Sequence, residues 1–317
     1  MGAVGGMHAK VAVIGCGNVG GAAASALAPV EGVSLVLLEE PCRESIAKAK
    51  AADISQAACA QRRDLQITGT SDWAAIEGAN ICVVTAGRPR SPGMSRDDLL
   101  EANVRTIRNV ALNIKRYSPG SVVIVVTNPL DIMAHQLFLH TGFPAYRVIG
   151  MSGHLDGARF RSLVAAHVGC SVREIGSIIM GGHGETMVPV LSHCSVGGIP
   201  LNLLIRSSQL RRIIYETRHG GGQIVSLMGT SGYFAAGACV ADMVSAVLFD
   251  RKGSFCASVY AQGEYGLQGF FLGMPVIMGR SGIEKIVELK LNDREHEWLR
   301  KSAQKVRALS ERACSIL

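Results

Sequence analysis

Residues 15–20 have the sequence Gly15-Cys16-Gly17-Asn18-Val19-Gly20, between a β-branched run at 10–14 and an alanine-rich segment that reaches residue 28. This order predicts a strand, a tight turn and a helix. Gly15 permits the turn, Gly17 lets a ligand approach the backbone, and Gly20 lets the helix pack on the strand. Because the amino end of the helix would face the turn, the stretch predicts a pyrophosphate site.

A second apolar run, at 33–38, ends in Glu39-Glu40, about twenty residues beyond the glycines. A carboxylate at this strand end can accept hydrogen bonds from both ribose hydroxyls of an adenosine and would repel a 2′-phosphate. We therefore expect Glu39 to favour NAD over NADP. The alternative is a solvated acidic loop, which fits Glu40 better because Glu39 directly ends the strand.

Strands and helices alternate over the first half of the chain. Apolar runs predict strands at 65–69, 81–85 and 122–126, and helices are expected at 43–60 and 96–117. This alternation indicates an α/β fold with a parallel, doubly wound sheet of the Rossmann type. Such sheets bind ligands beyond the carboxyl ends of their strands, where Gly87 and Asn128 lie.

The alternation weakens near Gly150, so we predict a NAD-binding Rossmann domain over 1–150 and an α+β substrate domain over 151–317. In the second domain we expect strands within 186–191 and 195–199 around a Gly197-Gly198 turn, further strands at 255–260 and 275–279, and helices at 210–218 and 235–248. Gly220-Gly221-Gly222 should end the first of these helices. A last helix should begin at Asn292 or Asp293, with Glu295 placed for a capping box if Asn292 is the cap.

Residues 180–185 have the sequence Met180-Gly181-Gly182-His183-Gly184-Glu185, between apolar runs at 175–180 and 187–191. A histidine among glycines between strand-like runs predicts a strand-end loop that presents an imidazole. With a partner that sets its tautomer, His183 can transfer protons near neutral pH. A turn whose histidine takes no part in chemistry fits this stretch equally well.

Asp156 and Arg159 lie three residues apart in a segment, 153–169, that predicts a helix, so they share one face. We interpret Asp156 as the partner that orients His183 and stabilises its protonated form, and Arg159 as the group that binds a substrate carboxylate. The alternative is a surface ion pair. Arg161 and His154 point elsewhere on the helix, and we expect both to have structural or supporting roles.

Residues 88–96 contain three arginines, two prolines and a glycine at the predicted ligand edge. A loop of this kind can close over a ligand and exclude water. Arginine binds carboxylates through a planar fork of two hydrogen bonds. We therefore predict functional roles for Arg90 and Arg96, and we interpret Arg88 as solvated surface.

The composition narrows the class of protein. The chain has 317 residues, 48% of them hydrophobic, and a net charge of +7 from scattered basic residues, which favours small anions over nucleic acid. A basic, soluble surface is an equally good interpretation of the charge. The nine cysteines show no zinc-binding spacing, so we expect no metal and free thiols in a reducing compartment. Without a signal peptide or membrane-spanning run, we predict a cytoplasmic protein.

From Lys10 to its C-terminus the chain resembles the lactate/malate dehydrogenase superfamily, and it is most similar to the bacterial, lactate-dehydrogenase-like malate dehydrogenases. The motifs that carry the resemblance, in this order, are the glycine turn, the arginine loop, Asn128-Pro129, Asp156 with Arg159, and Gly182-His183-Gly184. The ordered set is specific, whereas each motif alone is not. It implies NAD-dependent, reversible hydride transfer between (S)-malate and oxaloacetate.

The resemblance also implies a role for each site residue. His183 is the acid/base, paired with Asp156, and Arg159 forms a double salt bridge to the substrate carboxylate. Arg96 descends with its loop to polarise the carbonyl, Asn128 binds substrate or cofactor, and Arg90 occupies the specificity position, where it would bind the second carboxylate of a dicarboxylate. The implied cofactor contacts are Gly15, Gly17, Asn18, Val19, Gly20, Glu39, Thr85, Ala86, Gly87, Asn103 and Asn128.

Two alternatives remain. A lactate or other 2-hydroxy-acid dehydrogenase would use the same chemistry, but Arg90 argues against it. A non-catalytic NAD-binding scaffold could lose His183 or Asp156, yet both are present. The chain departs from the family pattern at Glu39, His154, Gly157, Glu185 and Ala236. The family further implies a homodimer or homotetramer, with the helix at 43–60 in the subunit contact, and no nucleic-acid or membrane partner.

Overall fold

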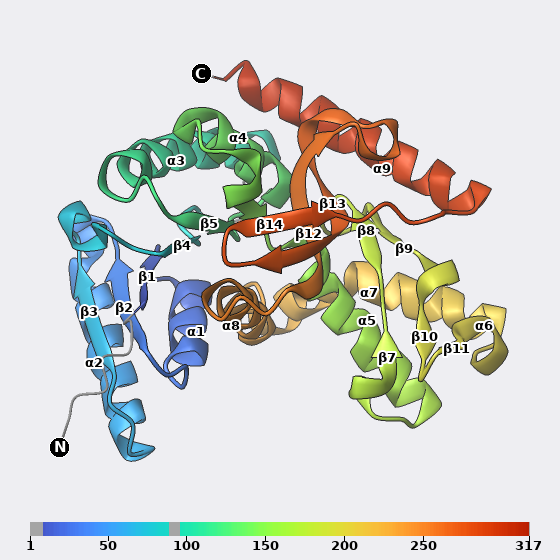
Figure 1. Cartoon of the computed structure of the whole chain (residues 1–317), viewed down its shortest axis with the longest axis horizontal. Helices are drawn as coiled ribbons and strands as arrows, with labels where there is room; N and C mark the ends of the chain where they lie inside the picture. The colour runs from blue at the N-terminus through green and yellow to red at the C-terminus, as the bar shows by residue number, and fades with distance from the viewer. Residues whose placement is uncertain (1–8, 89–95, 317) are drawn as a thin grey trace.

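The structure is a computed structural model that describes residues 9–88 and 96–316. Strands of the first half form a parallel sheet in the order β3-β2-β1-β4-β5-β6 (Figure 1). Their bounds are β1 Ala9–Ile14, β2 Val33–Leu38, β3 Gln66–Thr70, β4 Ile81–Val84, β5 Val122–Val125 and β6 Val148–Gly150. The order reverses at β1, as in a doubly wound sheet, and confirms the predicted fold class.

Helices cover both faces of this sheet. Helices α3 and α4 pack together on one side, and α1 packs with α8 on the other (Figure 1). The bounds are α1 Asn18–Leu27, α2 Glu44–Ala60, α3 Arg96–Tyr117, α4 Leu130–Thr141 and α8 Phe234–Leu248. Every residue of β4 and β5 is buried, which is why these strands are continuous apolar runs without alternation.

The second half adds antiparallel strands to the same sheet. Strand β12 meets β6 where Ser258 faces Gly150, and the sheet continues through β13, β8 and β9. The bounds are β8 Ile179–Gly181, β9 Met187–Pro189, β12 Gly253–Gln262, β13 Gln268–Gly279 and β14 Gly282–Ile286. The division that we predict at residue 150 therefore falls within one hydrogen-bonded sheet, and it stays a prediction.

The other helices surround a small sheet and close the fold. The helices are α5 Ser152–Val168, α6 Leu201–Leu204, α7 Ser207–Met228 and α9 Asp293–Cys314. The small sheet contains β7 Ile175–Gly176, β10 Ser195–Val196 and β11 Ile199–Pro200. Single 3₁₀ turns lie at Pro41–Arg43, Trp73–Ile76, Ala145–Arg147, Val172–Glu174, Leu191–His193 and Glu264–Gly266. None of the helices within the described ranges has the length and apolar character to cross a membrane.

One prediction about the second half was wrong in detail. The run at 175–180 is not one strand, because β7 pairs with β10 in the small sheet whereas β8 pairs with β9 and β13 in the large one. One apolar run is thus shared between two separate pairings, which periodicity alone cannot distinguish. At 195–200 two short strands, β10 and β11, pair with each other on either side of the Gly197-Gly198 turn, as predicted.

Helix α7 also corrects the sequence analysis. It continues through Gly220-Gly221-Gly222 and ends at Gly229, whose φ of 69° gives the left-handed C-terminal cap. Each interior glycine costs a helix about 1 kcal/mol. Gly220 and Gly221 face the side chain of Arg159, so the glycines allow the helix to pass close to that guanidinium.

The predicted capping box of α9 is confirmed. The Asn292 side chain accepts a hydrogen bond from the backbone N–H of Glu295, and Glu295 Oε2 accepts one from the N–H of Asn292. Glu295 is buried, and it also accepts hydrogen bonds from the N–H and Oγ of Ser192 at 3.0 and 2.7 Å. The cap therefore attaches the last helix to the segment that follows β9.

We expect Glu295→Ala to destabilise the fold by about 2 kcal/mol and Asn292→Ala by about 1 kcal/mol, because only the former also removes the acceptor of the two Ser192 hydrogen bonds. Urea unfolding of the two variants beside the wild type measures both values. Equal effects would mean that the contact with Ser192 adds nothing to the cap.

Candidate active site

Two positions in the turn after β1, Gly15 and Gly20, have no room for a side chain. Gly15 has a φ of 96°, and a Cβ there would lie 2.5 Å from the backbone nitrogen of Ala86. A Cβ on Gly20 would lie 2.0 Å from the carbonyl oxygen of Gly15. A Cβ on Gly17 would meet nothing within 4 Å. The first and third glycines thus serve packing, and the second leaves open space at the start of α1, which suits the approach of a pyrophosphate.

Lys50 of α2 supports this turn, and the sequence analysis missed it. Its Nζ donates hydrogen bonds to the carbonyl oxygens of Cys16 and Gly17, each at 2.7 Å. Both carbonyls are thereby turned toward the ammonium group, and a positive charge lies beside the expected pyrophosphate site. Burial lowers the pKa of Lys50. A lysine next to the buried alanine face of α2 gives no sign of this contact in the sequence.

Glu39 lies at the carboxyl end of β2, beside the glycine turn. Its side chain is 8% exposed, Oε2 accepts a hydrogen bond from the N–H of Cys16 at 2.8 Å, and Arg43 lies 3.8 Å away. Glu40 is exposed, as expected for a solvated loop. The Glu39 carboxylate is therefore fixed next to the turn, where the ribose of a bound dinucleotide would lie.

The loops that follow β4 and β5 are tied to each other. The Asn103 side chain of α3 accepts a hydrogen bond from the N–H of Arg88 at 2.7 Å and donates to the carbonyl oxygens of Arg88 and Asn128. Thr85 Oγ1 donates to the carbonyl oxygen of Gly15 at 2.5 Å, which joins the β4 loop to the glycine turn. The buried Asn103 thus positions two strand ends, while the Asn128 side chain is exposed at this edge.

Helix α5 begins directly after β6, at the same edge, and places its Asp156 and Arg159 beside His183 of the β8–β9 loop. Asp156 is 1% exposed. Its Oδ2 lies 2.8 Å from Nδ1 of His183, and its Oδ1 accepts a hydrogen bond from Nη1 of Arg159 at 2.9 Å. The predicted contact between Asp156 and His183 is thus present in the structure. One buried carboxylate holds an imidazole and a guanidinium side by side.

The charges around His183 make its imidazole a stronger base. Burial alone would lower the pKa of His183, but the charge of Asp156, the hydrogen bond from Asp156 and the charge of Asp131 together raise it above the ordinary value. Arg159 acts weakly in the opposite direction. With Nδ1 bonded to Asp156, Nε2 is the nitrogen that can exchange a proton with a substrate.

Two further residues hold the His183 loop, and the sequence analysis missed both. The N–H of Gly182 donates to Oγ of Ser302 in α9 at 2.8 Å, and the N–H of His183 donates to Oδ2 of Asp131 in α4 at 2.9 Å. Asp131 lies two residues after Asn128-Pro129, so a carboxylate next to a predicted site loop was the available signal. Ser302 has no such signal, because it lies on the buried side of a long helix far away in sequence.

The departures from the family pattern are accommodated locally. His154 does face away from Asp156: its Nε2 lies 3.0 Å from Oδ2 of Asp242 in α8, and its ring contacts Phe255 edge-on. A Cβ added to Gly157 would lie 3.3 Å from the guanidinium of Arg161. Arg161 in turn donates to Ser177, so it has a structural contact, as predicted. Ala236 is buried in α8, and Glu185 is exposed.

Two predicted residues cannot be placed. Arg90 lies outside the described residues. Arg96 begins α3, but its side chain also lies outside them. Of the predicted arginines, the structure therefore places Arg159 at the site and Arg88 as an exposed residue before the undescribed segment.

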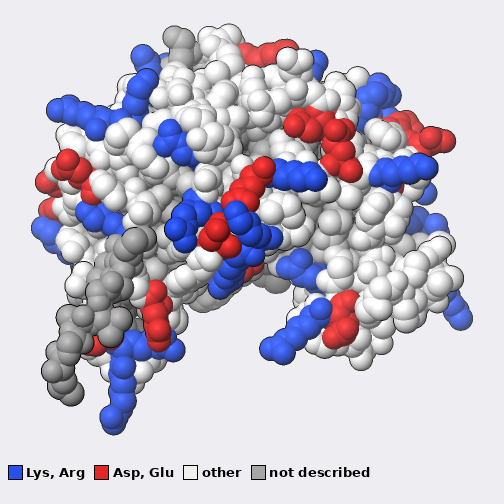
Figure 2. All heavy atoms as spheres, viewed as in Figure 1, with Lys and Arg blue, Asp and Glu red and all other residues white. Residues whose placement is uncertain are grey.

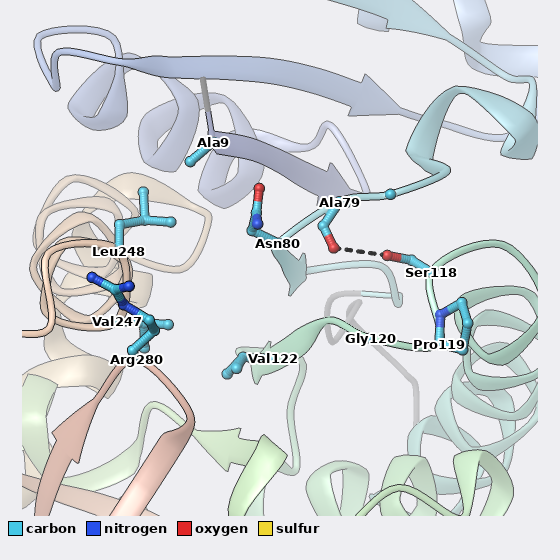
Figure 3. Close-up of a pocket in the computed structure, with 11 residues that line it drawn as sticks. Ala9, Ala79, Asn80, Ser118, Pro119, Gly120, Val122, Val247, Leu248 and Arg280 are labelled. Atoms are coloured by element: carbon cyan, nitrogen blue, oxygen red, sulfur yellow. Dashed lines mark hydrogen bonds between the residues drawn. The ribbon is translucent and has the colours of Figure 1, made fainter. Parts of the chain in front are cut away.

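A hollow of about 480 Å³ lies at the opposite edge of the sheet, near the start of β1, β4 and β5 (Figure 3). Two of its polar side chains bind backbone groups: Ser118 Oγ donates to the carbonyl oxygen of Ala79, and Asn80 Oδ1 accepts from the N–H of Lys10. It contains none of the predicted site residues. On the surface, basic and acidic side chains are interspersed on the face seen in Figure 2, with no large basic patch there.

The geometry defines what the site can do. A glycine turn with a neighbouring carboxylate suits a dinucleotide, and the residues present fit NAD. An arginine suits a carboxylate of a small substrate, and a histidine paired with a buried aspartate suits proton transfer beside it. No three histidine, cysteine or acidic side chains in the described part of the chain are arranged to hold a metal ion.

Comparison with known proteins gives a consistent result. A family model described as lactate/malate dehydrogenase, NAD binding domain, matches residues 9–150, and its α/β C-terminal counterpart matches residues 153–315. A malate dehydrogenase of Rhodopirellula baltica is 45% identical over 303 residues, covering 95% of this chain and 96% of that one.

Solved structures agree over nearly the whole chain. The malate dehydrogenase of Picrophilus torridus in its apo form has a TM-score of 0.91 at 37% identity and covers 97% of this chain and 98% of its own. A lactate dehydrogenase of Cryptosporidium parvum, complexed with lactic acid and nicotinamide adenine dinucleotide, has a TM-score of 0.92 at 35% identity. The match covers 96% of this chain and 98% of that one.

Proposed function

The chain belongs to the lactate/malate dehydrogenase family, and we propose that it is an NAD-dependent malate dehydrogenase that interconverts (S)-malate and oxaloacetate. The observation that carries the proposal is the buried Asp156 carboxylate, which holds His183 and Arg159 at 2.8 and 2.9 Å. That arrangement places a proton acceptor beside a carboxylate-binding group. The malate dehydrogenase of R. baltica, matched over nearly its full length, supports the choice of substrate.

In this mechanism Arg159 binds the carboxylate next to the reacting carbon through its planar fork. Neutral His183 accepts the malate hydroxyl proton at Nε2, and Asp156 stabilises the imidazolium that forms. Bound NAD⁺ supplies the hydride acceptor. In the reverse direction protonated His183 donates the same proton to the carbonyl oxygen of oxaloacetate. Arg96 meets the negative charge that develops on that oxygen, which in comparable sites is worth about 3 kcal/mol.

The remaining residues position the reactants. Gly17, Asn18 and Val19 present backbone N–H groups to the pyrophosphate, with Lys50 holding the turn, and Glu39 binds the ribose. Thr85, Ala86 and Gly87 line the edge beyond β4. Asn128 reaches substrate or cofactor with its exposed amide, and Asn103 positions the loop backbones.

Substrate choice is the point on which the closest alternative differs. The lactate dehydrogenase of C. parvum has nearly the same fold, so the fold does not separate malate from lactate. Arg90 supports a dicarboxylate, because a second carboxylate would neutralise it in the closed site. A non-catalytic NAD-binding scaffold is disfavoured by the intact His183–Asp156 contact.

We further propose a cytoplasmic enzyme that serves the tricarboxylic acid cycle, as a homodimer or homotetramer with α2 at a subunit contact and no nucleic-acid or membrane partner. The free thiols of the described residues support a reducing compartment. The test of the function is NADH oxidation, followed by its absorbance, with oxaloacetate and then with pyruvate. Oxidation with pyruvate alone would contradict the malate assignment.

Cofactor choice should follow Glu39. Its fixed carboxylate would repel a 2′-phosphate, so we expect a much higher kcat/KM with NADH than with NADPH. Glu39→Ala should bring the kcat/KM values for NADH and NADPH closer together. Glu40→Ala, at the exposed neighbour, should leave the ratio of the two values unchanged. Equal efficiency of the wild type with both cofactors would contradict the role of Glu39.

Proton transfer should depend on His183 and Asp156. His183→Asn should lower kcat by about 10²-fold or more while NADH still binds, because the glycine turn is remote from it. Asp156→Asn should also be severely impaired. The exposed His193 offers a matched control, since His193→Asn should retain activity. Near-normal turnover of His183→Asn would exclude it as the acid/base.

Discrimination between oxaloacetate and pyruvate should depend on Arg90. With pyruvate, loop closure would leave Arg90 desolvated and unpaired, at a cost of about 3 kcal/mol. Arg90→Gln should therefore lose most of its kcat/KM for oxaloacetate and gain some for pyruvate. Arg159→Gln should lower kcat/KM for both substrates. Arg88→Gln should change neither kcat/KM value strongly. An unchanged oxaloacetate-to-pyruvate ratio in Arg90→Gln would remove the main support for Arg90 as the discriminator.

A further inference from the structure

The loop that carries His183 has two consecutive backbone donors, and each is paired with a different kind of side chain. The N–H of Gly182 donates to the neutral hydroxyl of Ser302 at 2.8 Å. The N–H of His183 donates to the carboxylate of Asp131 at 2.9 Å. The loop is therefore attached to α9 by a neutral group and to α4 by a group that can carry charge.

Asp131 is unusual for a carboxylate because it is only 6% exposed. Its Oδ2 accepts from His183, and its Oδ1 accepts from Oγ of Ser258 in β12 at 2.6 Å. Both oxygens accept hydrogen bonds, which suits the ionised form. Within residues 9–88 and 96–316 no lysine or arginine forms an ion pair with Asp131, and the charge that stabilises its ionised form is that of His183.

We propose that Asp131 is a positioning residue for the acid/base: its carboxylate fixes the backbone of His183, and its negative charge, together with that of Asp156, stabilises the protonated imidazole. The proposal rests on the proposed function in so far as His183 is the acid/base. It differs from the role of Asp156, because Asp131 contacts the backbone of His183 rather than its ring.

The charged groups that face His183 are few in the described structure. Asp156 and Arg159 come from α5 and Asp131 comes from α4, while α9 contributes only the uncharged Ser302. Burial raises the pKa of Asp131, and the charge of Asp156 adds to that effect, whereas the hydrogen bonds from Ser258 and His183 oppose it. The positive charge that His183 gains on protonation is therefore stabilised by two buried carboxylates, Asp156 and Asp131.

Without the negative charge on Asp131, the pKa of His183 should fall. Malate oxidation needs neutral His183, so the rise of its kcat/KM with pH should move to lower pH. Oxaloacetate reduction needs protonated His183, so the fall of its kcat/KM with pH should also move to lower pH.

Asp131→Asn tests this with little change of shape, because its amide oxygen can still accept from His183 and its amide nitrogen can donate to Ser258. The matched control is Ser302→Ala, which removes the adjacent hydrogen bond without changing any charge. We expect both limbs of the pH profile to shift to lower pH in Asp131→Asn, and we expect a lower kcat with unshifted limbs in Ser302→Ala. Unshifted limbs in a folded Asp131→Asn would overturn the proposal.

A readout without catalysis separates this proposal from the proposed function. The pH titration of His183 can be followed by NMR in the full chain with labelled histidine, with its signal assigned through its loss in His183→Asn. The midpoint should be lower in Asp131→Asn. A lower midpoint in a protein without malate dehydrogenase activity would contradict the function but retain the role of Asp131. An unchanged midpoint of His183 in a variant of an active malate dehydrogenase would support the function and overturn the role of Asp131.

If Asp131→Asn fails to fold, as judged by circular dichroism, Ser258→Ala replaces it. Removing that hydroxyl weakens the support for the ionised carboxylate, so the same downward shift is expected with smaller size. An unchanged His183 midpoint in folded Ser258→Ala would then overturn the proposal.

Discussion

A buried negative charge must be neutralised, and the Asp156 carboxylate, at 1% exposure, is the charge around which the site is arranged. Removing an ion from water costs on the order of several kcal/mol unless an opposite charge and hydrogen bonds compensate. Arg159 and His183 supply that compensation, one on each oxygen. The proposed substrate carboxylate on Arg159 would therefore lie beside the imidazole because of the same aspartate that raises the pKa of His183.

The fold delivers these partners from elements far apart in sequence. Strand β6 ends where α5 begins, so the carboxyl edge of the parallel sheet leads directly into Asp156. The β8–β9 hairpin carries His183, and α4 and α9 hold its loop through Asp131 and Ser302. His183 is thus restrained at its ring and at its backbone, which limits the orientations that the imidazole can adopt.

How much of this was visible in the sequence depended on how local each signal was. The glycine turn, the strand that ends at Glu39 and the capping box of α9 each lie within a few residues, and all were predicted. Helix α4 carries little amphipathic pattern because most of its residues are buried, Asp131 among them, so the residue that supports His183 gave only its position after Pro129 as a signal. The glycines at 220–222 led to a wrong prediction that the helix ends there. The local helix-breaking signal is overridden because α7 passes close to Arg159.

Lys50 shows a further limit of the sequence, because its contact joins residues 34 and 33 positions apart in the chain. Its ammonium group binds two carbonyls of the glycine turn, and Glu39 accepts from the N–H of Cys16 in the same turn. A cation and an anion thus hold opposite groups of one backbone segment, so the conformation of the turn is set by α2 and β2 as well as by its glycines. The same arrangement recurs at His183, where side chains from other elements fix a glycine-rich loop. In both places glycines let the backbone pack closely against neighbouring groups, and charged side chains from other elements supply the rigidity that glycine lacks.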